Sequence, residues 1–238
     1  MDQATLFALA GVAALIGVLH TLAGPDHYLP FVAMSRAGRW SLARTLTVTL
    51  AAGTGHVLGS AALGLAGVAT GLAVGRLEWV EQFRGQLAGW LLLGFGLAYL
   101  VWGLRRAVRN RPHAHWHAHG DGTVHVHEHR HVGEHTHVHQ DRPDVIRLTP
   151  WVLFTIFVFG PCEPLIPLLM YPAARGSFWG VALVTVVFGV CTLAAMTAAV
   201  AAGHLGLGRL PAPWLGRFGH AAAGLAVAAC GAAVILGL

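Results

Sequence analysis

The sequence of 238 residues contains no lysine, and all 15 of its basic residues are arginine. The phosphate-binding loop of P-loop ATPases requires a lysine in the pattern G-x-x-x-x-G-K-[ST], so this chain is not itself an ATPase of that class. If it drives a solute uphill, the energy must come from an ion gradient or from a partner protein.

Charge of either sign is also scarce, because charged residues make up 11% of the chain and hydrophobic residues 55%. That composition lies outside the range of soluble globular domains. The few cysteines, Cys162, Cys191 and Cys230, all fall in apolar windows, where a disulfide framework is not expected. We therefore predict an integral membrane protein rather than an enzyme, surrounded by the lipid bilayer and without a nucleic-acid partner.

Six apolar windows approach or exceed the length of about 20 helical residues that crosses a bilayer. We predict an all-α polytopic protein with six transmembrane helices. The segment 105–147 separates a first three-helix repeat (1–104) from a second (148–238). The windows are 4–23 (continuing to about 35), 45–74, 86–104, 148–171, 178–204 and 215–238.

Arginine placement indicates the orientation of these windows. Twelve of the 15 arginines lie in the segments after the first, third and fifth windows, and the other three, Arg76, Arg84 and Arg175, are expected on the opposite side. Positively charged loops are cytoplasmic as a rule. We expect a multi-pass protein of the cell membrane with both termini outside and 105–147 in the cytoplasm.

The two halves share a short pattern. G-P-D-H-Y-L-P at 24–30 and G-P-C-E-P-L-I-P at 160–167 occupy corresponding windows, the first and the fourth. Because each half has an odd number of spans, a repeat would be inverted across the membrane, as in secondary transporters with broken helices and a midplane substrate site. We predict inverted repeats with breaks in helices 1 and 4.

The first window contains His20, Asp26 and His27 around Gly24-Pro25. Ionisable side chains are costly in a bilayer and mark functional sites by default, and imidazole with carboxylate is a ligand set for transition metals. In an unbroken helix His20 and His27 would be about 10 Å apart along the axis. Pro25 interrupts the helix and disfavours helical geometry at the residue before it, which lets the two rings meet.

Two further windows add candidate ligands. His56 lies between Gly55 and Gly59, whose spacing favours close approach of another helix, which we expect to be the first span. Glu163 is the only carboxylate besides Asp26 that we place inside the bilayer, where it could balance the charge of a divalent cation. It could instead couple protons or pair with a histidine, while packing is preferred for Cys162. The predicted metal ligands are His20, Asp26, His27, His56 and Glu163.

Between residues 113 and 139 there are eleven histidines, many at alternate positions. Histidine-rich tracts of this kind bind metals. The polar composition of the segment predicts a disordered cytoplasmic tether that captures ions loosely. The alternative is a charge switch, because histidines titrate near neutral pH. The H-E-x-x-H pattern at 127–131 is expected by chance in so dense a run and does not indicate a protease.

Three motifs resemble those of the NicO superfamily of nickel/cobalt transporters, and most closely its UreH-like branch of urease accessory membrane proteins. They are H-T-L-A-G-P-D-H at 20–27, G-H-V-L-G-S at 55–60 and G-P-C-E-P-L-I-P-L-L at 160–169. The resemblance implies a six-span permease for Ni²⁺ or Co²⁺ in which His20, Asp26, His27 and His56 match the metal-recognition motifs. It also implies a cytoplasmic partner such as a metal chaperone or a nickel-enzyme maturation factor. Five residues separate His20 from Asp26 here, where the better-known nickel permeases have four.

The residues alone leave other functions open. Imidazole and carboxylate also accept Zn²⁺, so a zinc transporter of a different fold is one alternative. A membrane thiol-disulfide electron carrier is another, because Cys162 lies in a P-C-E-P pattern. An exporter of a small sulfur-containing anion fits the fold type but not a site that carries acids. The direction of transport is not fixed by the sequence.

Overall fold

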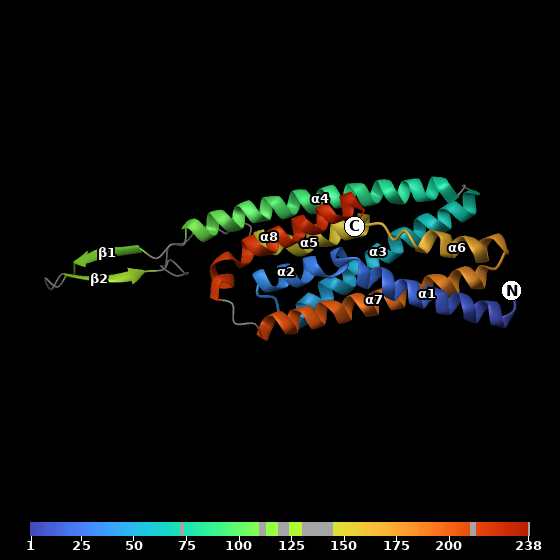
Figure 1. Cartoon of the computed structure of the whole chain (residues 1–238), viewed down its shortest axis with the longest axis horizontal. Coiled ribbons are helices and arrows are strands. Elements are labelled where there is room, and N and C mark those ends of the chain that lie inside the picture. The colour runs from blue at the N-terminus through green and yellow to red at the C-terminus, as the bar shows by residue number, and fades with distance from the viewer. Residues whose placement is uncertain (72–73, 110–112, 119–123, 130–144, 210–212, 238) are drawn as a thin grey trace.

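The computed structural model describes residues 1–71, 74–109, 113–118, 124–129, 145–209 and 213–237. Their helices form an elongated bundle in which most axes lie roughly along the longest dimension (Figure 1). The elements are α1 (Gln3–Ala23), η1 (Pro25–His27), α2 (Leu29–Ala37), α3 (Leu42–Thr70), α4 (Val74–Arg109), β1 (His113–Ala118), β2 (Val124–His129), α5 (Val145–Phe159), α6 (Leu165–Ala174), α7 (Phe178–Arg209) and α8 (Pro213–Leu236).

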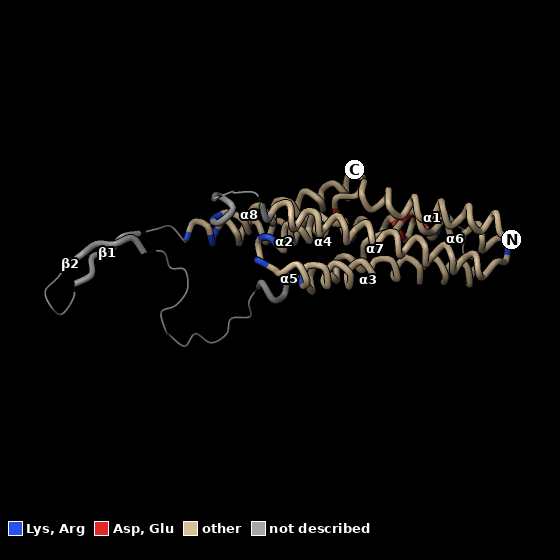
Figure 2. The backbone as a smooth tube through the Cα atoms, turned by 90° about the horizontal axis from the view of Figure 1, so that it is seen from below, with Lys and Arg blue, Asp and Glu red and all other residues tan. Residues whose placement is uncertain are grey.

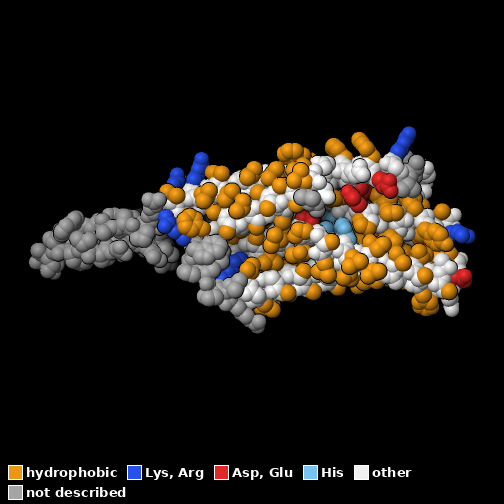
Figure 3. Space-filling view, in the orientation of Figure 1, with side chains coloured by type: hydrophobic (Ala, Val, Ile, Leu, Met, Phe, Trp, Pro, Cys, Tyr) orange, Lys and Arg blue, Asp and Glu red, His pale blue; other side chains and the backbone are white. Residues whose placement is uncertain are grey.

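The described chain has the character of an all-α membrane protein. Five of its helices, α1, α3, α4, α7 and α8, are long and apolar enough to cross a bilayer. Large apolar side chains lie on the outside, as with Phe7 at 76% and Trp179 at 80% exposure, and they cover the bundle face seen in Figure 3. This is how a bundle surrounded by lipid differs from a soluble one. The predicted membrane class is therefore confirmed.

The predicted fourth span is two shorter helices. α5 ends at Phe159 and α6 begins at Leu165, so the second Gly-Pro pattern interrupts the chain as the first one does. The apolar parts of these helices, Thr149–Phe159 and Leu165–Ala174, are each too short to cross a bilayer alone. The breaks expected in windows 1 and 4 are present, while the layout of six spans in two inverted repeats stays a prediction.

Helix α4 begins earlier than its apolar window. The sequence predicted a span from 86 to 104, but the helix runs from Val74 to Arg109 and carries Glu81 fully buried. Arg84, which lies outside the predicted window, is part of this helix and pairs with Glu81 one turn earlier. Pairing offsets the cost of two charges that a hydropathy window counts separately.

The histidine-rich segment was predicted to be disordered, but part of it forms an antiparallel strand pair in which His113 faces His129 and His117 faces His125. The reason is the alternation of histidine with other residues, which has the period of a strand. The prediction relied on composition and ignored that period. Residues 119–123 and 130–144 of the segment lie outside the described residues.

Small residues allow the closest helix contacts. A Cβ added at Gly96 of α4 would meet the backbone of Ala228, and one added at Gly224 of α8 would meet the backbone of Leu100. A Cβ at Gly17 of α1 would lie 3.0 Å from the carbonyl of Phe188 in α7. These approaches hold α8 against α4 and α7 against α1, in the manner of small-residue packing between membrane helices.

The buried apolar residues form two main clusters. One gathers around Phe31, Phe157 and Val200, and the other around Leu165 and Phe188. The histidines of the first two windows lie where the clusters meet, because Phe157 contacts the rings of His27 and His56 and Phe188 contacts that of His20. The fold thus encloses its polar site between two apolar regions.

Candidate metal centre

The Gly24-Pro25 break turns the chain back on itself. Helix α1 ends at Ala23, Gly24 takes an extended conformation (φ −91°, ψ 96°), and Pro25–His27 forms a single turn of 3₁₀ helix. A Cβ at Gly24 would lie 2.6 Å from Nδ1 of His27, so this close approach needs glycine. The turn brings the rings of His20 and His27 to a centroid distance of 4.6 Å. The break therefore does what the sequence analysis expected of it.

Helix α3 supplies the third imidazole. The ring of His56 lies 5.3 Å from that of His27, and both side chains are almost wholly buried. One ring nitrogen from each of His20, His27 and His56 lies within 4.8 Å of the other two. Ligand nitrogens around a tetrahedral metal are roughly 3.4 Å apart, since each bond is about 2.1 Å. This upper limit is compatible with the spacing of ligand nitrogens in a loaded site.

The Nε2 atoms of these three histidines are buried and have no hydrogen-bond partner among the described residues. On the other side of the ring, Nδ1 of His27 contacts the Gly24 carbonyl at 3.1 Å and Asp26 Oδ1 at 3.3 Å. Nδ1 of His56 contacts the Phe157 carbonyl at 3.3 Å. Because those acceptors require an N–H, both Nε2 atoms keep a free lone pair, the form in which imidazole binds a metal.

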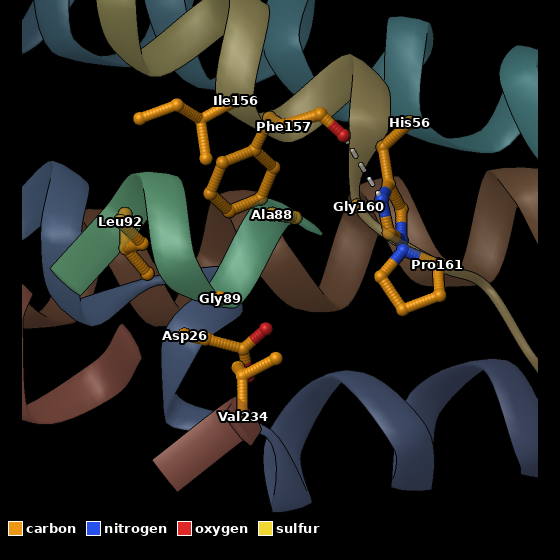
Figure 4. Close-up of a pocket in the computed structure, with 10 residues that line it drawn as sticks. All are labelled: Asp26, His56, Ala88, Gly89, Leu92, Ile156, Phe157, Gly160, Pro161 and Val234. Carbon is orange, nitrogen blue, oxygen red and sulfur yellow. Dashed lines mark hydrogen bonds between the residues drawn. The ribbon is translucent and has the colours of Figure 1, made fainter. Parts of the chain in front are cut away.

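Asp26, a predicted ligand, lies behind His27 and outside the converging group. Carboxylates in this position fix the tautomer of a ligating histidine and contribute negative charge. Asp26 also lines a cavity of about 30 Å³ with His56, Phe157 and Pro161 (Figure 4). That volume accommodates about one water molecule. The cavity gives the site a small, mostly apolar space next to Asp26 and His56.

Glu163, the fifth predicted ligand, is exposed and lies outside the histidine group. The fully buried carboxylate of this region is Glu81, which the sequence analysis had not placed in the bilayer. Of these two carboxylates, the one buried in the bundle is therefore Glu81 and not Glu163. Cys162 is fully buried in the second apolar cluster, which agrees with the preference for packing.

The glycines beside His56 accept a different neighbour from the one expected. A Cβ at Gly55 would lie 2.6 Å from the Val158 side chain, and one at Gly59 would lie 3.2 Å from the Val158 carbonyl. The helix that approaches here is α5, and the prediction of the first span was wrong. Because α5 comes so close, the Phe157 carbonyl reaches the ring of His56.

Sequence reasoning missed a second polar group next to the triad. Glu81 and Arg84 form an ion pair that Ser60 also contacts, one helical turn beyond His56. The spacing of opposite charges three residues apart on one helix was the signal that could have identified it.

Comparison with family models, with curated proteins and with solved structures finds no match for this chain. The function must therefore be inferred from the residues and from the geometry of the site.

Proposed function

We propose that this chain is a membrane permease that carries a divalent transition-metal ion, Ni²⁺ or Co²⁺, through the His20–His27–His56 triad by alternating access. The observation that supports this best is the convergence of three imidazoles with unpartnered, buried Nε2 atoms. Buried polar atoms nearly always have partners, so three together require an explanation. A metal ion that arrives as substrate supplies it.

Incomplete coordination favours transport over a structural role. Structural zinc sites are closed by four protein ligands, whereas this triad offers three, so a position remains for water or an entering ligand. The ligands also stand beside interruptions in the helices, at Gly24 and at Gly160. Secondary transporters place substrate sites at such breaks, where the two halves can move relative to each other.

The choice of Ni²⁺ or Co²⁺ as the substrate rests on the type of ligand and on the sequence motifs. Neutral imidazole accepts Ni²⁺, Co²⁺ and Zn²⁺, and affinity alone does not select among them. The resemblance of the motifs favours nickel and cobalt. Asp26, next to His27, supplies the negative charge that lowers the cost of a divalent cation in the bundle interior.

The remaining parts fit a path through the cell membrane. The arginines of the described helices gather at the end of the bundle where α2 lies, while the N-terminus lies at the opposite end (Figure 2). By the positive-inside rule the arginine-rich end is cytoplasmic. There the histidine-rich segment would exchange ions with a metal chaperone or a maturation factor.

The proposal is tested with the full chain in liposomes that carry gradients of Ni²⁺, Co²⁺ or Zn²⁺. His27→Asn should abolish transport, since it removes the central ligand and keeps a polar side chain of similar size. Glu163→Gln is the matched control and should transport normally. If His27→Asn transports normally while glutamine at all eleven histidines of 113–139 abolishes transport, the site has been assigned to the wrong region.

The same assay tests the electron-carrier alternative. Cys162→Ser removes the thiol on which that mechanism depends, and a permease with a histidine site should keep its transport. Loss of transport in Cys162→Ser with unchanged metal binding would favour the thiol mechanism.

A further inference from the structure

The break between α5 and α6 removes a helical hydrogen bond next to the metal site. In a continuous helix the Cys162 N–H would donate to the Val158 carbonyl, four residues earlier. Here α5 stops at Phe159, so both groups need other partners. Pro161 has no N–H, so the Phe157 carbonyl loses its regular donor four residues later and accepts from the Gly160 N–H at 2.9 Å instead.

The ion pair of α4 takes up both halves of the lost bond. Arg84 Nη2 donates to the Val158 carbonyl at 3.0 Å and to that of Gly160 at 3.4 Å. The Cys162 N–H donates to Glu81 Oε2 at 3.1 Å. Arg84 Nη1 donates to Glu81 Oε1 and so joins the two groups of contacts. A charged pair from one helix thus stands in for a backbone bond of another.

Stability alone does not explain a pair in this position. The Glu81 side chain is 0% exposed and that of Arg84 16% exposed, and a buried ion pair seldom stabilises more than apolar side chains of the same size. The two charges match the backbone groups at the break, because the Arg84 guanidinium donates to carbonyls and the Glu81 carboxylate accepts from an N–H. This arrangement fixes the broken chain in one geometry.

The fixed chain bears directly on His56. The Phe157 carbonyl, which accepts from Nδ1 of His56, belongs to the residue just before Val158. Ser60 lies one turn after His56 on α3 and donates to Glu81 Oε2 at 3.2 Å. The pair therefore links α3, through Ser60, to the α5–α6 break next to the carbonyl that His56 contacts. A shift of the break would move the carbonyl that sets the orientation and tautomer of His56.

We propose that Glu81 and Arg84 are positioning residues for the metal centre, which hold the α5–α6 break so that the Phe157 carbonyl orients His56 for metal binding. This inference rests on the proposed function, since it takes the triad as the metal site. Partners behind metal-ligating histidines affect metal affinity by 10- to 100-fold.

The first test measures the Co²⁺ affinity and the ligand-field absorption of the full chain. The part of the signal that is lost in His27→Asn is assigned to Co²⁺ bound at the triad. The double variant Glu81→Leu/Arg84→Met leaves no unpaired charge and should therefore fold. We expect Co²⁺ binding about 10- to 100-fold weaker, with a changed absorption spectrum. Arg76→Met/Glu78→Leu, at exposed positions of the same helix, is the matched control and should match the wild type. Equal affinity and spectrum in the two double variants would overturn the inference.

The second test uses the wild type. The chain has three cysteines, so ¹⁵N-cysteine labelling gives three amide signals, one of them in the break and two in α7 and α8. The Cys162 amide should exchange with solvent within about tenfold of the helical Cys191 and Cys230 amides, because Glu81 and Ser60 accept its proton. Free exchange of Cys162 in the wild type would contradict the role of the pair.

The outcomes separate the two proposals. Absence of any His27-dependent Co²⁺ signal in the wild type would contradict the metal site, and with it the positioning role. A wild-type signal that Glu81→Leu/Arg84→Met leaves unchanged would contradict the positioning role alone.

Discussion

At the scale of single residues, His27 is the central side chain of the metal site. Its ring contacts those of His20 and His56, and its Nδ1 atom meets Asp26. His27 can make all of these contacts because the chain turns at Gly24. A larger residue at position 24 would displace the His27 ring. The chemistry of the site therefore depends on a glycine that binds nothing itself.

Asp26→Asn should weaken binding of Ni²⁺ or Co²⁺ by about 10- to 100-fold without abolishing it, because the carboxylate acts through His27. Titration of the purified full chain measures the affinity. Glu163→Gln should leave that affinity unchanged, since Glu163 is exposed and lies outside the triad. The reverse pattern, with Glu163 important and Asp26 not, would contradict the ligand geometry described above.

Gly24→Ala should weaken metal binding at least as much as loss of Asp26, since its Cβ would fall on the His27 ring. Gly11→Ala, on the same helix with open space around its Cβ, is the control and should bind like the wild type. Co²⁺ absorption distinguishes a displaced ligand from a misfolded chain, because a folded variant with an altered site keeps its helical circular dichroism.

At the scale of helices, close contacts of α4 with α8 depend on positions without side chains. Gly96→Ala should lower the unfolding temperature, because its Cβ meets the Ala228 backbone and overpacking costs about 1–3 kcal/mol. Gly94→Ala, two residues away and facing open space, should not lower it. Equal unfolding temperatures for the two variants would show that the α4–α8 contact is looser than described.

The helices also show where sequence reasoning succeeds. Both breaks were predictable, because a proline acts on its own backbone and on the residue before it whatever surrounds them. The meeting of His20 and His27 follows from the first break. His56 could be chosen as a candidate because a histidine inside an apolar window is itself unusual.

What the sequence did not predict depends on contacts between distant segments. The start of α4 was missed because a hydropathy window counts Glu81 and Arg84 as two separate charges, although their pairing lowers the cost of burying them. The neighbour of Gly55 was misassigned because small-residue spacing says that a helix approaches, not which one. Glu163 was predicted to be a ligand, but it is exposed. It lies in the break between α5 and α6, and the direction of a side chain in such a break cannot be predicted from helical periodicity.

At the scale of the whole molecule, apolar side chains cover the bundle and arginines concentrate near one end (Figures 2 and 3). In a background without the native cysteines, Arg76→Cys should react with a membrane-impermeant maleimide on intact cells, and Arg36→Cys should react only after the cells are opened. Both positions are exposed in the structure. Labelling of Arg36→Cys on intact cells would reverse the predicted orientation.

Metal binding should also stabilise the folded protein. Ni²⁺ at 100 times its dissociation constant contributes about 2.7 kcal/mol if it binds only the folded state. Histidines in 113–139 can bind metal in the unfolded chain as well, which reduces their effect on stability. The shift in unfolding temperature should therefore persist when those eleven histidines become glutamine and vanish in His27→Asn.

X-ray absorption at the nickel K-edge tests the triad most directly, using the full chain with glutamine at the eleven histidines of 113–139 and one equivalent of Ni²⁺. We expect a spectrum with about three imidazole ligands at roughly 2.0–2.1 Å, which should be absent from the same protein carrying His27→Asn. A shell of oxygen ligands alone, or a spectrum that His27→Asn leaves unchanged, would contradict a metal site at the triad.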